Sequence, residues 1–300
     1  MSDTLTPAEA DHAMRNWTYR SIGQIQIGSA QHKKMFCEML LTTHNPYKPA
    51  VIDWPALAPD ALKRITSLPI WDIAVQTEGR ASIHVSTYAA SIKDPLLREA
   101  ITMNGGEEAR HKVVLSNLVQ AYGIQLEPEP DYAVPRDPEW AWLVTGYSEC
   151  VDSFFAFGLF EVARRSGYFP PELIETFEPV MQEETRHILF FVNWAAWHRR
   201  TLPWWRRPWF MLKSSAVWAF LIWERIGIAR GIDRKGEMQD ANFAMNGAEQ
   251  IGVAIEPPAL IELCLAENDR RMAGYDSCLL RPTVVPMLAR LALRALSVAR

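Results

Sequence analysis

A five-residue pattern, Glu-Glu-x-Arg-His, occurs twice in this chain, at residues 107–111 and again at 183–187. Within each copy, a glutamate and a histidine stand three positions apart. On an α-helix such positions project from nearly the same face, one turn from each other. Each copy can therefore present a carboxylate and an imidazole to one ion, and a site that uses both copies needs two helices that meet. These pairs are Glu108 with His111 and Glu184 with His187.

Spacing alone leaves an ambiguity in each copy. Glu107 and Glu183 stand four positions before their histidines and can also reach the same ion. Arg110 and Arg186 stand beside the histidines and can form ion pairs with nearby glutamates. These ion pairs lie either at the surface or just outside the residues that bind the ion.

The sequence indicates an almost entirely helical chain, because strand-like alternation is rare and Gly and Pro cluster in a few places. Long helices are expected at about 70–92, 97–122, 139–165 and 171–200. The breaks "KDP" and "SGYFPP" are short, so each flanking pair of helices should form an antiparallel hairpin. The long, proline-rich stretch between residues 122 and 139 is typical of a crossover between two hairpins.

Three parts are expected along this all-α chain. Residues 1–69 form one or two helices, a proline-rich loop and a short helix, all packed on a bundle formed by residues 70–200. Residues 201–300 form a helical extension of about three helices, interrupted at Pro203, Pro208, "EPP" and Pro282.

A pair of metal ions usually needs more carboxylates than two Glu-x-x-His units supply. Glu78 and Glu149 lie sixteen and seventeen residues before their hairpin turns, whereas Glu108 and Glu184 each lie thirteen residues after them. Since each residue advances about 1.5 Å along a helix, the four glutamates should lie at matching heights. Glu161 is too near its turn to be level with Glu184.

Three further polar side chains are weighed against this set. Asp152, one turn beyond Glu149, is interpreted either as an acceptor for a ligand histidine or as a local charge partner. His84 is expected to point away from Glu78, and His198 lies too far along its helix.

One glutamate from each of two helices, with Glu-x-x-His from each of the other two, is the ligand pattern of ferritin-like di-iron carboxylate proteins. Residues 70–200 resemble that superfamily, in its oxidase and oxygenase branch. The resemblance implies a ferritin-like four-helix bundle and favours the second glutamate of each doublet. The implied ligands and catalytic residues are Glu78, Glu108, His111, Glu149, Glu184 and His187.

The resemblance also implies two iron ions, with a manganese–iron pair as the alternative, O2 as co-substrate, and an external electron donor such as a ferredoxin or flavin reductase. Oxygen and nitrogen ligands without thiolates suit these metals. The expected function is an O2-dependent oxidase or oxygenase acting on an apolar or aromatic small molecule by hydroxylation, desaturation or N-oxygenation. Arylamine N-oxygenases of this layout carry a third histidine where this chain has Val180. The alternatives are an iron-handling ferroxidase and a helical binding protein without catalysis.

Charge and composition bear on partners and location. A net charge of -4 and a pI near 6.0 give no electrostatic case for nucleic acid binding. Four scattered cysteines suit a reducing compartment, and no secretory leader is read at the N-terminus, so a cytoplasmic protein is expected. A homodimer is an alternative to the monomer.

Tryptophan and arginine gather in one stretch of the extension. Seven of the twelve tryptophans fall between Trp194 and Trp223, and "HRRTLPWWRRPWFMLK" has five Lys or Arg and no acid. This composition suits peripheral contact with anionic lipid at the inner face of a membrane. The preferred interpretation is packing on the bundle, with arginine heads reaching water. The same alternatives apply to the amphipathic C-terminal segment "VPMLARLALRALSVAR".

Overall fold

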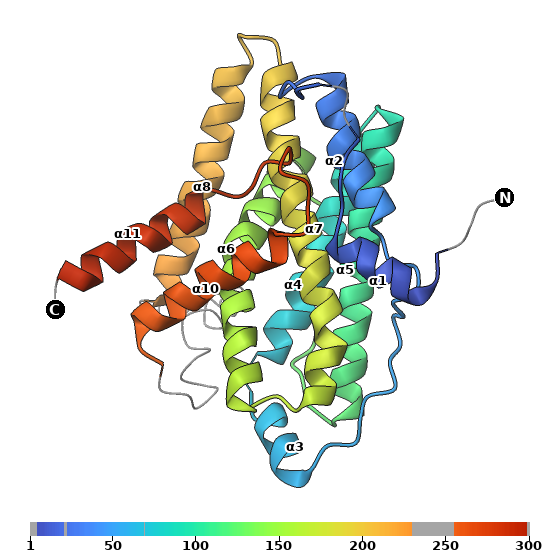
Figure 1. Cartoon of the computed structure of the whole chain (residues 1–300), viewed down its shortest axis with the longest axis vertical. Coiled ribbons are helices and arrows are strands. Elements are labelled where there is room, and N and C mark those ends of the chain that lie inside the picture. The colour runs from blue at the N-terminus through green and yellow to red at the C-terminus, as the bar shows by residue number, and fades with distance from the viewer. Residues whose placement is uncertain (1–4, 21–22, 69, 230–254, 299–300) are drawn as a thin grey trace.

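A computed structural model of the chain describes residues 5–20, 23–68, 70–229 and 255–298. The described residues form an all-α protein, and no strand occurs within them (Figure 1). The helices are α1 (Pro7–Arg15), α2 (Ala30–Thr42), α3 (Pro59–Thr66), α4 (Trp71–Ser91), α5 (Pro95–Ala121), α6 (Pro138–Ser166), α7 (Pro171–Thr201), α8 (Arg207–Ala229), α10 (Pro257–Met272) and α11 (Val284–Val298).

Prolines and caps set the ends of the long helices. Asp94 and Asp137 cap α5 and α6 by accepting backbone N–H groups three residues on, each followed by a proline at the first helical position. Gly167, with φ 68°, ends α6 in the left-handed conformation that glycine tolerates. The expected break at Pro203 and Pro208 separates α7 from α8, and Pro208 lies in the first turn of α8, where its missing N–H costs no hydrogen bond.

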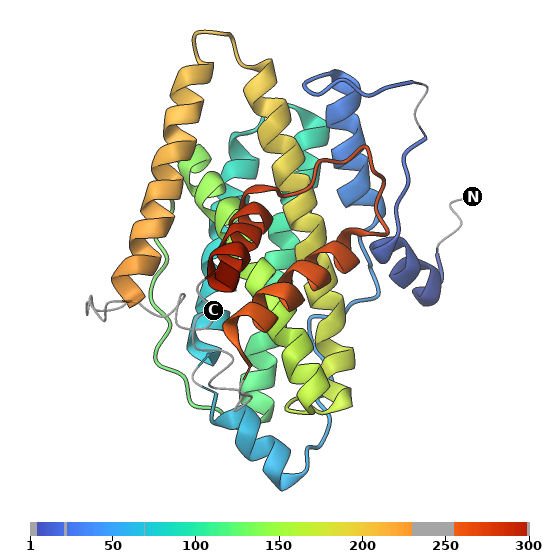
Figure 2. The same ribbon diagram turned by 60° about the vertical axis from the view of Figure 1, so that its left-hand side comes forward.

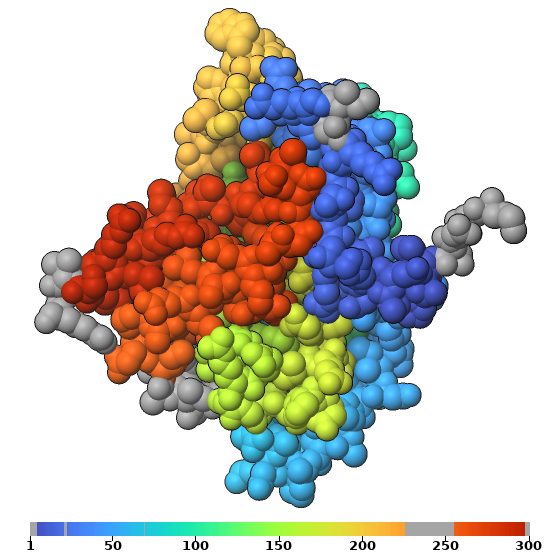
Figure 3. Space-filling view, viewed as in Figure 1, coloured from blue at the N-terminus to red at the C-terminus, as the bar shows by residue number. Residues whose placement is uncertain are grey.

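The four long helices pack against one another. α4 lies along α5 and α6, α6 lies along α7, and α5 contacts α7. α2 packs against both α5 and α7, on the opposite side of the molecule from α8 (Figures 1 and 2). α10 covers α6 and carries α11, so these two helices form much of the face seen in Figure 3.

The interior has two large apolar clusters. One centres on the aromatic rings of Tyr88, Trp142, Phe191 and Trp194. These rings stack or meet edge to face, and the ring centroids of contacting pairs lie 5.4–5.8 Å apart. The other lies towards α3 and holds Trp71 and other apolar side chains. Along α4, α5 and α7 the predicted ligands fall between these clusters, which places them in the middle of the protein.

None of the helices in the described part of the chain is long and apolar enough to cross a membrane.

Candidate metal centre

The structure brings the six predicted ligand residues together between α4, α5, α6 and α7. One donor atom from each of four residues lies within 4.8 Å of the others, and a second group of three residues meets the same limit. Glu108 belongs to both groups, so two ion-sized sites share one carboxylate. The first group is Glu78, Glu108, His111 and Glu184, and the second is Glu108, Glu149 and His187.

The two histidines turn their Nδ1 atoms towards these carboxylates. His111 Nδ1 lies 3.1 Å from Glu184 Oε1 and 3.7 Å from Glu78 Oε2. His187 Nδ1 lies 2.8 Å from Glu108 Oε1. Both rings are fully buried, with centroids 5.9 Å apart.

Several of the buried nitrogen and oxygen atoms that could bind an ion make no hydrogen bond. The contacts at Nδ1 do not have hydrogen-bond geometry, and none of the atoms has a hydrogen-bond partner among the residues that the structure describes. Buried polar atoms normally have a hydrogen-bond partner. A cluster of buried atoms without partners therefore needs an explanation, and a bound ion provides one. The atoms are Nδ1 of His111 and His187, and Oε1 of Glu108 and Glu149.

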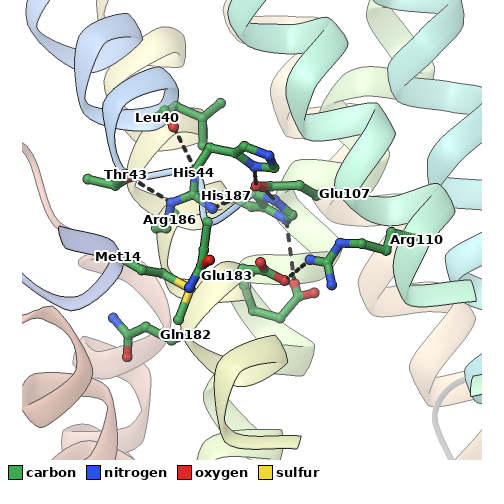
Figure 4. A network of polar contacts seen from close by, with 12 residues as sticks. Met14, Leu40, Thr43, His44, Glu107, Arg110, Gln182, Glu183, Arg186 and His187 are labelled. Atoms are coloured by element: carbon green, nitrogen blue, oxygen red, sulfur yellow. Dashed lines mark hydrogen bonds and ion pairs between the residues drawn. The ribbon is translucent and has the colours of Figure 1, made fainter. Parts of the chain in front are cut away.

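The first glutamate of each doublet contacts the histidine on the opposite helix, and Figure 4 shows Glu107 beside His187. Glu183 Oε2 lies 2.8 Å from His111 Nε2, and Glu107 Oε2 lies 2.8 Å from His187 Nε2. An ionised carboxylate only accepts hydrogen bonds, so each Nε2 donates a proton, and in the neutral ring Nδ1 keeps its lone pair for an ion. The two glutamates of each doublet therefore have different positions. The second glutamate faces the centre, and the first orients the histidine of the other helix.

The arginines of the two copies lie behind the histidines and not at the surface. Arg186 NH1 donates to both carboxylate oxygens of Glu107, at 2.9 and 3.0 Å, and its side chain is fully buried. Arg110 forms an ion pair with Glu183. Of the two interpretations that the sequence allows, pairing in a layer behind the ligands is the one observed.

These partners set the charge of the outer glutamates. Burial acts to raise the pKa of Glu107, but the Arg186 guanidinium and hydrogen bonds from His187 and His44 hold that pKa well below its usual range. Burial also opposes ionisation of Glu183, yet its hydrogen bond to His111 and the charges of His111 and Arg110 lower its pKa. Both outer glutamates are therefore ionised and paired.

At the inner carboxylates Glu78 and Glu149, burial outweighs the opposing effect of the nearby histidines. Burial raises the pKa of Glu78 to about 7, and it raises the pKa of Glu149 well above its usual range, where the charges of Glu108 and Glu184 add to the effect. Burial alone would lower the pKa of His111, but its hydrogen bond to Glu183 and the nearby charge of Glu78 raise that pKa well above its usual value. Without ions, the inner site is thus held by protons on Glu78, Glu149 and the histidines, and bound cations would take the place of these protons.

The segment at the end of α2 also contributes contacts that the sequence does not predict. Arg186 Nε donates to Thr43 Oγ1 at 2.7 Å, and Arg186 Nη2 donates to the carbonyl oxygen of Leu40 at 2.6 Å. His44 Nδ1 lies 2.6 Å from Glu107 Oε1. These residues lie more than sixty positions from either pentapeptide, and no spacing rule connects them to it.

The other polar candidates are engaged elsewhere. Asp152 pairs with Arg225 at 2.7 Å, which fits the interpretation as a charge partner and not as an acceptor for a ligand histidine. Glu161 pairs with Arg164 and Arg165. His84 Nδ1 lies 3.1 Å from Thr145 Oγ1, and His198 contacts Glu139.

A cavity of about 710 Å³ lies against the centre. The inner carboxylates Glu78, Glu108, Glu149 and Glu184 form part of its wall, and Val180 also lines it. The rest of the lining is mainly apolar and includes Trp71, Phe160, Phe169, Phe177 and Met181. The cavity is also lined by the crossover at Arg136 and Asp137 and by Phe220, Leu221 and Glu224 of α8.

The chain matches no protein-family model, no curated protein and no solved structure at a significant level.

Proposed function

We propose that the protein is an O2-dependent oxidase or oxygenase that holds two metal ions, most simply two irons, in a bundle of the ferritin-like kind. Its substrate is an apolar or aromatic small molecule. The observation that carries this proposal is the pair of donor groups that share Glu108 in the wall of a mainly apolar cavity.

The residues present fit two divalent cations. The outer glutamates are balanced by Arg110 and Arg186, which leaves four inner carboxylates around the centre. Two doubly charged ions neutralise the charge of these four carboxylates when all are ionised. The ions also bind the buried nitrogen and oxygen atoms that make no hydrogen bond. A set of carboxylates and imidazoles without thiolates suits iron or manganese, so a manganese–iron pair remains the alternative.

Each part of the chain has a physical task in this proposal. Glu78, Glu108, His111 and Glu184 hold one ion, and Glu108, Glu149 and His187 hold the other. The metal pair, when bound, supplies O2 binding and oxidation. Glu107 and Glu183 keep the histidine protons on Nε2, and the apolar cavity binds substrate and excludes water. An external donor, a ferredoxin or flavin reductase, supplies electrons.

The shape and lining of the cavity favour some reactions over others. A mainly apolar space of about 710 Å³ suits an organic substrate better than the transit of hydrated iron, so a ferroxidase and a non-catalytic binding protein rank behind an oxidase or oxygenase. Val180 supplies no imidazole where N-oxygenases have one. Hydroxylation and desaturation are therefore preferred to N-oxygenation.

Anaerobic loading with Fe(II), followed by mixing with O2 in a stopped-flow spectrometer, tests the proposal. We expect about two irons per chain, as in di-iron carboxylate proteins, and a transient absorbance as they oxidise. Glu108→Ala should abolish both, because this carboxylate belongs to both groups. Glu99→Ala, an exposed position on the same helix, is the matched control and should retain both. Unchanged metal content in Glu108→Ala and Glu184→Ala would overturn the proposal.

A further inference from the structure

An apolar stripe runs along the outer side of α8. From Trp209 on, its members are spaced alternately by three and four residues, which places them on one helix face. Trp205 lies in the turn just before α8, and all the members are exposed. Trp209 is 70% exposed, Leu212 59% and Trp223 56%. We call this stripe the α8 ridge and define it as Trp205, Trp209, Leu212, Ala216, Ala219 and Trp223.

Tryptophan exposure is concentrated at this place. Among the described residues, the exposed tryptophans are Trp204, Trp205, Trp209 and Trp223, and all lie on the ridge or next to it. The turn between α7 and α8, which carries the first two, projects at the top of the molecule (Figure 3). A large contiguous apolar surface of this kind marks a contact with another body.

α11 adds a second apolar surface on the same side of the molecule as α8 (Figure 1). Met287, Leu288 and Leu291 of α11 are each about half exposed. The two helices border a shared groove of about 480 Å³, lined by Met211, Ser215 and Trp218 of α8 and by the start of α11. Each of these groove residues stands directly before a ridge residue or one turn from it, so the groove lies beside the ridge and connects α8 with α11.

Positive charge surrounds the turn at the end of the ridge. Arg199, Arg200, Arg206 and Arg207 lie there, and none forms an ion pair with a residue in the described part of the chain. Arg207 is held by backbone carbonyl oxygens of Leu202 and Arg200, and the Arg206 guanidinium lies 4.9 Å from the Trp205 ring centre. The sequence contains no acidic residue from 194 to 223.

We propose that the α8 ridge and α11 dock the protein on an anionic membrane surface. Tryptophan rings favour the level of the lipid head groups, and arginines beside them are attracted to lipid phosphates. A helix with one apolar face lies along such an interface. A second copy of the chain is a poorer occupant, because it brings the same positive charge to the contact and no acidic partner for it.

Docking has a consequence for the cavity. One flank of α8, at Phe220, Leu221 and Glu224, lines the 710 Å³ cavity, so docking through the ridge would bring this wall of the cavity close to the bilayer. This step rests on the proposed function: the substrate class is then a lipophilic molecule dissolved in the membrane.

Vesicle flotation of the full, metal-loaded chain tests the docking. We expect it to float with vesicles of phosphatidylcholine and phosphatidylglycerol, to stay behind with phosphatidylcholine alone, and to be released by high salt. The double variant Trp205→Ser with Trp209→Ser, and separately Arg206→Glu, should each weaken partitioning by about tenfold or more. All three side chains are exposed, so the fold should be retained, which circular dichroism checks.

Two controls match these changes at exposed positions elsewhere. Val51→Ser removes an apolar side chain that is 69% exposed, and Arg98→Glu reverses an exposed charge on α5. Both should float like the parent. The proposal is overturned if the parent stays in solution with both kinds of vesicle, or if the controls lose partitioning as strongly as the ridge variants.

The same preparations separate docking from catalysis and from self-association. Loss of flotation with full metal content in the ridge variants supports docking. A parent that floats but holds no metal contradicts the proposed function and leaves docking supported. A dimer that the double tryptophan change dissociates, in a protein that binds no vesicles, overturns docking and assigns the ridge to a second copy.

Discussion

At the level of single residues, the two doublets divide their work by crossing between helices. Glu107 of α5 orients His187 of α7, while Glu183 of α7 orients His111 of α5. The choice between the two glutamates of a doublet is not readable from spacing, because positions three and four before a histidine both face it. The contact that decides it lies on another helix.

Glu183→Gln tests this division of labour. The amide can donate to His111 Nε2, which favours the tautomer with the proton on Nδ1 and removes that nitrogen as a ligand. We expect metal affinity to fall by about 10- to 100-fold, as for other outer partners of ligand histidines. Titration with Co(II) measures it. Glu99→Gln should bind like the parent, and equal affinity in the two variants would contradict the role of Glu183.

Arg186→Met tests the buried ion pair behind His187. It leaves Glu107 buried without its main charge partner, so the free energy of unfolding should fall by about 3–5 kcal/mol. Urea denaturation of the metal-free protein measures this loss. The exposed Arg98→Met is the control and should change stability by less than about 0.5 kcal/mol. A similar small effect in Arg186→Met would show that the pair contributes no stability.

The raised pKa of Glu78 gives the metal-free protein a pH dependence of known sign. Its carboxyl takes up a proton at about pH 7 when folded but near 4.5 when unfolded, so the folded state binds more protons between these values. The raised pKa values of Glu149 and the two histidines act in the same direction as pH rises. We expect the melting temperature of the metal-free protein to fall from about pH 5 to pH 7.

Metal should reverse this trend, because its ligands bind in their deprotonated forms and affinity rises with pH. Melting curves with and without Fe(II) under argon compare the two cases. A metal-free protein that becomes more stable over this interval would show that the outer pairs, and not the inner carboxylates, dominate its pH dependence.

At the level of helices, the sequence predicts the four long segments to within about two residues, since Pro, Asp caps and Gly167 mark their ends. The heights of Glu78 and Glu149 follow from the same marks, because both hairpin turns are short. What the sequence does not predict is the closeness of helices that are distant in the chain. α2 reaches Arg186 and Glu107 through side chains whose partners no local pattern specifies.

Gly158→Ala tests the close approach of α10 to α6. A Cβ at this position would lie 2.3 Å from Cys264 Sγ and 3.1 Å from its backbone, so the helices must separate. We expect a loss of about 1–3 kcal/mol in the free energy of unfolding with unchanged metal content. Gly106→Ala, in a helix with nothing near the added Cβ, should instead gain about 0.5–1 kcal/mol. Urea denaturation distinguishes the two, and a gain in both would contradict the close contact.

For the whole molecule, the candidate centre joins elements that are otherwise held by two separate apolar clusters. α4, α5, α6 and α7 each contribute at least one of the six side chains, and the layer behind them reaches α2 through Thr43. Ions bound there would connect the two hairpins. The sequence indicates the donors, but the cavity beside them depends on side chains from α4, α5, α6, α7, α8 and the crossover, and its shape cannot be read from any one segment.

Metal removal should therefore destabilise the protein as a unit. Ions that bind only the folded chain, at a free concentration 100 times their dissociation constant, add about 2.7 kcal/mol. For a protein of 300 residues that corresponds to a rise of roughly 4 °C in the melting temperature. Calorimetry before and after chelation measures the difference. Glu108→Ala should melt at one temperature in both states, because it lacks the shared carboxylate. If the parent also melts at one temperature in both states, ions do not join the two hairpins.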